Sequence, residues 1–181
     1  RRRLKQVPLD FPEELGTSIH LDMAGTPDGR LVVRTGSAVR ILDRSMRVLQ
    51  TVAGEYDNFI AASDDSIFHE RTDGEGPDKL HRSSYDGTVE AEYQLEGYRF
   101  CSPMLAPGGL LFCGIYVEED GDRDEIVALD AQTLQLRHRF GLGLLNATRQ
   151  LAVGGDELYV CDTGNHRLQV FSLTGEHRRS I

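Results

Sequence analysis

Leu151–Ile181 reads LAVGGDELYVCDTGNHRLQVFSLTGEHRRSI, with a Gly-Asn pair between two short apolar runs. Leu158 and Val160 alternate with Tyr159 and Cys161, and the same alternation recurs over residues 168–171. Both runs therefore have the two-residue period of a β-strand. Gly164 and Asn165 accept positive φ at little energetic cost, and a tight two-residue loop requires this conformation. The segment therefore predicts a β-hairpin that turns at Gly164 and Asn165.

In this register Asp162 and Arg167 face each other across the hairpin. An opposite-charge cross-strand pair of this kind stabilises a hairpin by roughly 0.2–1 kcal/mol. We therefore interpret Asp162, Gly164, Asn165, His166 and Arg167 as a structural signature of the turn rather than as a ligand site.

The same segment resembles the NHL repeat, a unit that forms one blade of a β-propeller. The resemblance covers about one blade and is carried by ELYV at 157–160, DTGNHR at 162–167, LQVF at 168–171 and Gly175. It implies a propeller fold, but it implies no particular activity, because one fold supports many functions.

The pattern of strand openings recurs four times along the chain. Leu31, Ile67, Leu111 and Leu158 occupy equivalent places, 36, 44 and 47 positions apart, and blades commonly repeat every 40–50 residues or so. A small residue precedes each opening, as suits strands crowded around a propeller axis: Ala24, Ala62, Ala106 and Ala152. The third strands end near side chains that can bond to their own turns: Asp43, Asp86, Asp130 and Ser172.

These repeats predict an all-β chain, a β-propeller built of four-stranded antiparallel blades. The blades are expected at about 17–53, 57–95, 100–140 and 147–181. Residues 1–12 are expected to hold the fourth strand of a preceding blade, or a strand that closes the ring. Because the last blade already has a fourth strand, we expect the four blades to be part of a larger propeller, and the resemblance to NHL proteins implies six blades. A self-contained ring of four blades, as in hemopexin-like domains, is the alternative.

The composition favours a protein as the partner. A net charge of −9 disfavours nucleic acid and anionic membranes, whose phosphates attract clustered Lys and Arg. No apolar run reaches the roughly 18 residues of a membrane span. Cys101, Cys113 and Cys161 lack disulfide-framework spacing and are expected to be free, buried thiols. Free thiols, together with the lack of a leader in the given sequence, favour an intracellular location. The first residue is Arg rather than Met, so we expect a processed or truncated chain.

Two loops between second and third strands are enlarged and acidic, and they belong to adjacent blades. They are expected to be neighbours on one face, either as solvated hairpin tips or as a docking surface for a basic protein. The candidate partner-binding residues are Asp73, Glu75, Asp78, Glu118, Glu119, Asp120, Asp122 and Asp124.

The sequence predicts no catalytic residues, no cofactor and no metal site. Asp120, Asp122 and Asp124 alternate like calcium ligands, but the sixth and twelfth positions of that loop are not Gly and Glu. Propeller enzymes of the lyase and lactonase types, which resemble NHL proteins, gather metal ligands at the axis. The inner strands of this chain offer these polar residues at the axis: His20, Asp22, Asn58, Ser102 and Arg149-Gln150. One histidine among them is too few for such a metal site.

The leading functional hypothesis is therefore a non-catalytic scaffold for protein–protein interaction. Two alternatives stay open: a propeller enzyme with an axial metal site, and an RNA-binding NHL domain. The basic clusters at Arg1–Arg3 and His177–Arg179 lie at chain ends without interleaved aromatic residues, so the sequence favours RNA binding less.

Overall fold

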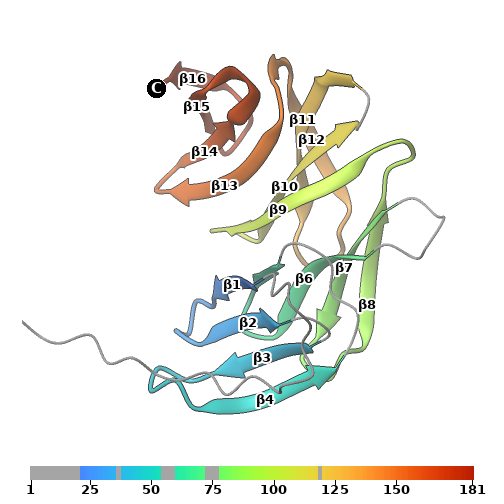
Figure 1. The fold of residues 1–181 in the computed structure, drawn as a ribbon, viewed down its shortest axis with the longest axis vertical. Coiled ribbons are helices and arrows are strands. Elements are labelled where there is room, and N and C mark those ends of the chain that lie inside the picture. The colour runs from blue at the N-terminus through green and yellow to red at the C-terminus, as the bar shows by residue number, and fades with distance from the viewer. Residues whose placement is uncertain (1–20, 36–37, 54–59, 72–77, 118–119) are drawn as a thin grey trace, which may run out of the picture.

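The computed structural model describes residues 21–35, 38–53, 60–71, 78–117 and 120–181. These residues form four antiparallel sheets of four strands each, arranged around a common axis (Figure 1). In every sheet the spatial order of the strands is their order along the chain. The prediction of an all-β propeller with four-stranded blades is confirmed. The larger, six-bladed ring stays a prediction, and the strand expected within residues 1–12 lies outside the described residues.

Each blade begins at the axis and ends at the rim. Blade 1 contains β1 (Leu21–Gly25), β2 (Leu31–Thr35), β3 (Ala38–Leu42) and β4 (Val48–Ala53). Blade 2 contains β5 (Ile60–Ala62), β6 (Ser66–Arg71), β7 (Lys79–Ser84) and β8 (Val89–Gln94). Blade 3 contains β9 (Arg99–Ala106), β10 (Leu110–Val117), β11 (Asp120–Asp130) and β12 (Leu136–Leu145). Blade 4 contains β13 (Thr148–Gly154), β14 (Glu157–Asp162), the one-turn 3-10 helix η1 (Thr163–Asn165), β15 (Arg167–Ser172) and β16 (His177–Ser180).

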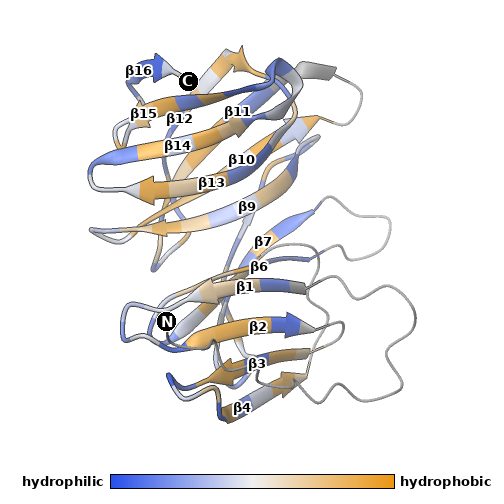
Figure 2. Ribbon diagram, turned by 60° about the vertical axis from the view of Figure 1, so that its left-hand side comes forward, coloured by the Kyte–Doolittle hydropathy of each residue, from blue (hydrophilic) through white to orange (hydrophobic). Residues whose placement is uncertain are grey.

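Apolar clusters join each blade to the next. The first packs Val32 and Ile41 of blade 1 against Ile67 of blade 2. The second packs Phe68 of blade 2 against Phe100 of blade 3, and a third cluster joins blade 3 to blade 4. Figure 2 shows hydrophobic residues along the strands of all four sheets. Burying one such side chain stabilises the fold by about 1.5–3 kcal/mol, so these joints hold the propeller together.

The turns between third and fourth strands are closed by side chains, as the sequence predicts. The Asp43 Oδ1 atom accepts a hydrogen bond from the Ser45 N–H at 2.9 Å, and Asp86 Oδ1 accepts one from the Thr88 N–H at 2.9 Å. Asp130 and Ser172 accept equivalent bonds in blades 3 and 4. These polar residues therefore serve their own turns.

The signature hairpin is partly as predicted. Asp162 pairs with Arg167 in the β14–β15 register, and its Oδ2 atom lies 2.7 Å from Arg167 Nε. The prediction that Gly164 and Asn165 both have positive φ is wrong, because these residues belong to η1 and the left-handed residue is His166, with φ of 54°. Gly164 is needed for a different reason. Its N–H donates to the Asn146 carbonyl at 2.9 Å, and a Cβ at Gly164 would lie 3.0 Å from that oxygen.

We expect Gly164→Ala to lower the free energy of unfolding by about 1–3 kcal/mol, because the added methyl group would force the turn away from Asn146. Gly25→Ala is the matched control. A Cβ at Gly25 has no neighbour within 4 Å, so its effect should stay within about 0.5 kcal/mol. Urea unfolding of both variants measures the difference. Equal stability of the two variants would show that the close approach to Asn146 is unimportant.

Candidate functional site

An axial pocket of about 240 Å³ lies where the inner strands of all four blades meet. Asp22, Ser102 and Gln150, which the sequence predicts at the axis, all line this pocket. His20 and Asn58 lie outside the described residues. The remaining lining residues are Met23, Ile60, Pro103, Met104 and Leu151.

Two inner strands are distorted beside the axial pocket. The pairing of β9 with β10 shifts register around Ser102 and Pro103, and Ser102 has φ of 48°. The pairing of β13 with β14 shifts between Thr148 and Leu151, which includes Gln150. Bulges re-aim side chains and are frequent beside binding sites. A left-handed residue other than glycine also marks backbone that the surrounding structure must hold in place.

The polar groups of the pocket also connect blades. The Asp22 Oδ2 atom accepts a hydrogen bond at 2.7 Å from the N–H of Ile60, the first residue of β5. Ser102 Oγ accepts one at 3.0 Å from the Leu151 N–H in blade 4. The positions of Asp22 and Ser102 in the pocket are therefore set by the joints between blades.

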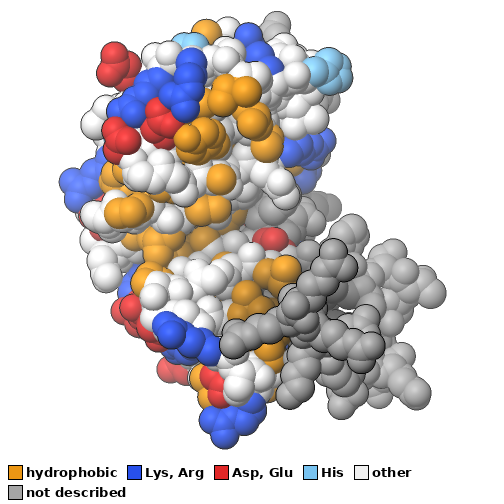
Figure 3. Space-filling view, turned by 90° about the vertical axis from the view of Figure 1, so that its left-hand side faces the viewer, with side chains coloured by type: hydrophobic (Ala, Val, Ile, Leu, Met, Phe, Trp, Pro, Cys, Tyr) orange, Lys and Arg blue, Asp and Glu red, His pale blue; other side chains and the backbone are white. Residues whose placement is uncertain are grey.

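A second, apolar pocket of about 160 Å³ adjoins the first and shares Met23, Ile60, Pro103 and Met104 with it. Met23 is 63% exposed. Figure 3 shows hydrophobic side chains gathered on one face of the molecule, including the narrow middle region between its upper and lower halves. The axial site thus has a polar part and an apolar part.

We call the end of the blades where β14 passes into β15 the A face, and the opposite end the B face. The inner strands begin at the A face because β1, β5, β9 and β13 all run toward the first-to-second turns on the B face. Asp22 and Ile60 lie at the starts of their strands, so the polar pocket lies toward the A face. The acidic loops predicted from the sequence follow β6 and β10, which also end at the A face.

Three of the acidic residues near those loops are buried in the structure. Asp78 is 4% exposed, and its Oδ2 atom lies 3.8 Å from NH1 of Arg99 in the next blade. Asp124 is 1% exposed, and its Oδ2 atom accepts the Thr148 N–H at 2.7 Å. Glu125 is buried in a bidentate pair with Arg139. Asp78 and Asp124 are therefore buried, whereas the sequence predicts exposed loop tips for them. Their carboxylates contact Arg99 and the Thr148 N–H within the protein.

Asp73, Glu75, Glu118 and Glu119 lie outside the described residues, and so do the side chains of Asp120 and Asp122.

The signature residues surround a buried carboxylate. Asp162 accepts hydrogen bonds from Asn146 N at 2.8 Å, Asn165 Nδ2 at 3.0 Å and Arg167 Nε at 2.7 Å. Asn165 and Arg167 also line a groove of about 460 Å³ beside the end of β12. His166 is exposed at the turn. Burial by itself raises the pKa of Asp162, but its hydrogen bonds outweigh this effect and hold the pKa below the usual value.

Glu70 belongs to the same set of joints, although the sequence analysis did not single it out. Its Oε1 atom accepts the Phe100 N–H of β9 at 3.3 Å. Together with Asp22 and Asp124, it places a carboxylate at each of the three successive joints between described blades. No spacing in the sequence marks these three residues, because they lie on a first, a second and a third strand.

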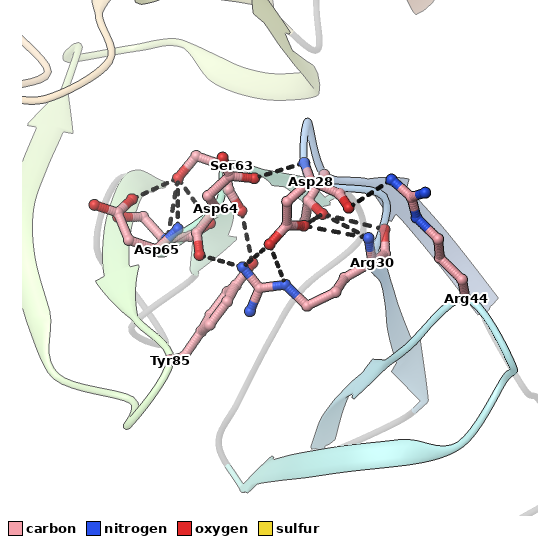
Figure 4. A network of polar contacts seen from close by, with 9 residues as sticks. Asp28, Arg30, Arg44, Ser63, Asp64, Asp65 and Tyr85 are labelled. Carbon is pink, nitrogen blue, oxygen red and sulfur yellow. Dashed lines mark hydrogen bonds and ion pairs between the residues drawn. The ribbon is translucent and has the colours of Figure 1, made fainter.

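The carboxylates of the B face are already engaged. Between blades 1 and 2, the Asp28 N–H donates to Asp64 Oδ1 at 2.9 Å, and the Arg30 guanidinium lies 5.1 Å from the centre of the Tyr85 ring (Figure 4). Arg30 also holds the pKa of Asp28 well below its usual range. Hydrogen bonds lower the pKa of other aspartates in B-face turns: Asp43, Asp65, Asp86 and Asp130.

The cysteines are free in the structure, as predicted. Cys101 and Cys113 are buried, whereas Cys161 is half-buried, which departs from the prediction. Burial raises the pKa of the Cys101 thiol to about 12, and it also raises the pKa of the Cys113 thiol well above its usual value. These two thiols are therefore poor nucleophiles at neutral pH.

The described part of the chain contains no group of three or more His, Cys, Asp or Glu side chains placed to share a metal ion. Over the same residues, no helix has the length and apolar character needed to cross a membrane.

Comparison with known proteins agrees with this geometry. Residues 150–171 match the family model of the NHL repeat. No curated protein matches the chain in sequence. Solved structures with a similar fold include a protein of unknown function from Bacteroides caccae, with a TM-score of 0.62 and 15% identity over 94% of this chain and 63% of that one.

Two further structures are similar over 90% of this chain at 16% identity. They are BamB from Moraxella catarrhalis, with a TM-score of 0.57, and a chain of the Mitotic Checkpoint Complex, with a TM-score of 0.64. The match covers 52% and 51% of those chains, so this chain spans about half to two thirds of the length of the three similar structures. At these identities the likeness shows the fold alone.

The two buried aspartates beside the blade 3–blade 4 connection should respond to pH in opposite directions. Folding lowers the pKa of Asp162, so its stabilising effect is present above about pH 4 and is lost as the pH falls through the folded pKa. Burial raises the pKa of Asp124, so its contribution is present below about pH 4 and is lost as the pH rises through the folded pKa.

We expect Asp162→Asn to lower the free energy of unfolding at neutral pH by about 2–4 kcal/mol, because it removes the charge opposite Arg167. Asp124→Asn is the matched comparison, since its amide oxygen can still accept the Thr148 N–H. In the parent, stability falls as the pH rises and Asp124 ionises, and Asp124→Asn should make this fall smaller. Urea unfolding at several pH values between about 3 and 7 measures both effects. Parallel pH profiles for the two variants would contradict the assignment.

Proposed function

We propose that this chain is a non-catalytic protein-interaction scaffold whose A face binds a partner with a basic surface. The observation that carries the proposal is the pair of acidic segments, residues 73–78 and 118–125, that follow second strands ending at the A face. On the B face, aspartates are bonded within their own turns or to Arg30 and Arg137. The acidic residues of the A-face loops are additional to these, in a chain with a net charge of −9.

The basic residues at the base of the A-face loops support this proposal. Arg99 lies beside the buried Asp78, and Arg139 is paired with the buried Glu125. Both cations are matched by buried carboxylates. A surface that carries charges of one sign attracts an oppositely charged partner and speeds its association. Added salt weakens this electrostatic steering.

The positions of the two loops favour a single surface. Asp78 begins the segment that leads into β7, and its contact with Arg99 joins blade 2 to blade 3. Asp124 and Glu125 lie in β11 of blade 3. Asp78 anchors the first loop at the blade 2–blade 3 joint, and the second loop leads into β11 of blade 3, so the two loops belong to adjacent blades. This adjacency supports a common docking surface for Asp73, Glu75, Glu118, Glu119, Asp120 and Asp122.

The experiment compares two double variants that remove the same charge from opposite faces. Glu118→Gln with Glu119→Gln changes the A face, and Asp156→Asn with Glu176→Gln changes exposed B-face turns. We expect both to keep the free energy of unfolding within about 0.5 kcal/mol of the parent. The A-face variant should associate several-fold more slowly with a synthetic peptide of alternating Lys and Ser at low salt, because steering is weakened.

Stopped-flow fluorescence with the labelled peptide, at about 20 and 300 mM salt, measures the association rate. The difference between the two variants should disappear at the higher salt. Equal rates for the parent and both variants at low salt would refute the acidic docking surface.

A further inference from the structure

We propose that the axial pocket binds a primary ammonium group on an aliphatic chain, and that its natural occupant is a lysine side chain of the protein partner. This inference rests on the proposed function and adds the chemical group that the partner inserts. The steps below concern the charge of the pocket, the geometry of its acceptors, its size and its position.

The charge of the pocket favours a cation. Asp22 is the one charged side chain among the described residues that line the polar and apolar pockets. Within the described part of the chain, it makes a hydrogen bond to the Ile60 N–H but forms no ion pair. Arg149 is not a lining residue. A carboxylate partly removed from water is stabilised by a cation bound beside it.

The acceptor geometry favours an ammonium over a guanidinium. Arginine binds a carboxylate best through both oxygens at once, but Asp22 Oδ2 already accepts the Ile60 N–H. An ammonium is a compact charge with three donors. Asp22, Ser102 and Gln150, whose side chains all carry oxygen acceptors, line one pocket. The pocket therefore matches the donor set of lysine.

The size and walls of the pocket fit one side chain. Its 240 Å³ corresponds to about eight water molecules, at about 30 Å³ each, and lies below the volume typical of drug-sized ligands. Met23 and Met104 line both the polar and the apolar pocket. Their flexible thioethers can pack against the methylene stem of a lysine while its ammonium reaches Asp22.

The position of the pocket connects it to the proposed docking surface. Asp22 lies at the A-face end of β1, the same face from which the acidic loops extend. A basic partner drawn to that face would bring its lysines to the mouth of the axis, where Gln150 is exposed. The loops would then govern the rate of encounter, and Asp22 the lifetime of the complex.

The methionines allow a direct test. The chain has three, and Met46 lies in the β3–β4 turn away from the pocket, so it is an internal reference. The chain is labelled with ¹³C at the methionine methyl groups and titrated with acetyl-Gly-Lys-Gly-amide. We expect the Met23 and Met104 signals to shift and saturate while the Met46 signal stays fixed. The same peptide with an acetylated lysine, which carries no charge, should bind at least about tenfold more weakly.

Two variants test the role of Asp22 separately from folding. Asp22→Asn keeps an oxygen for the Ile60 N–H but removes the charge. It should weaken the binding of the lysine peptide at least about tenfold. Gln150→Lys leaves that hydrogen bond untouched and places a competing ammonium at the exposed mouth, so it should also abolish the shifts. Asp156→Asn removes one charge from the B face and should bind like the parent. The unperturbed methionine spectrum of each variant reports whether it is folded.

The outcomes separate this inference from the proposed function. Shifts at Met23 and Met104 that depend on the lysine charge and on Asp22 support the axial site. Equal binding of the charged and acetylated peptides, or full affinity in Asp22→Asn, overturns it. Salt-sensitive association without any change at Met23 and Met104 also overturns it, while leaving the acidic docking surface in place.

Discussion

A carboxylate that accepts the amide of the next inner strand is the interaction on which the arrangement of the blades depends. Asp22, Glu70 and Asp124 make this bond at successive joints, to Ile60, Phe100 and Thr148. Each of these amides donates to a carboxylate of the preceding blade, and a buried amide requires an acceptor. Apolar clusters supply most of the stabilising energy at the joints but have no directional preference. The carboxylate bonds fix where each inner strand begins, and therefore the shape of the axis.

Much of the fold follows from local chemistry and could be predicted from the sequence. Alternating residues define strands, and turn residues such as Asp43 and Asp130 define where they end. The outer edge shows one repeated feature that the sequence did not reveal. In every blade the register shifts by a bulge at the start of the fourth strand, at Leu42–Val48, Ser83–Val89, Leu129–Leu136 and Phe171–His177. Bulges of this kind disrupt the pairing surface of an exposed edge.

The predictions that failed depended on contacts between distant residues. The conformational freedom of glycine predicts a positive φ at Gly164. The structure instead uses Gly164 for its close approach to Asn146, which belongs to the connection before β13. Asp124 looked like part of an acidic loop, yet the Thr148 amide across the joint makes it an internal acceptor. A strand pattern shows which residues alternate, but it does not show which neighbouring blade they meet. The axial residues Asp22, Ser102 and Gln150 were predictable because every inner strand must approach the same axis.

The double use of Asp22 connects the stability of the propeller to what the axis can bind. One oxygen holds the Ile60 amide at the blade 1–blade 2 joint, and the same carboxylate is the charged group of the pocket. A cation beside it would offset the unfavourable removal of the charge from water without taking away the bond to Ile60. Any ligand that binds the folded chain alone also stabilises it, by an amount that grows with the logarithm of the ligand concentration relative to Kd. Binding at the axis and closure of the joint would therefore reinforce each other through a single side chain.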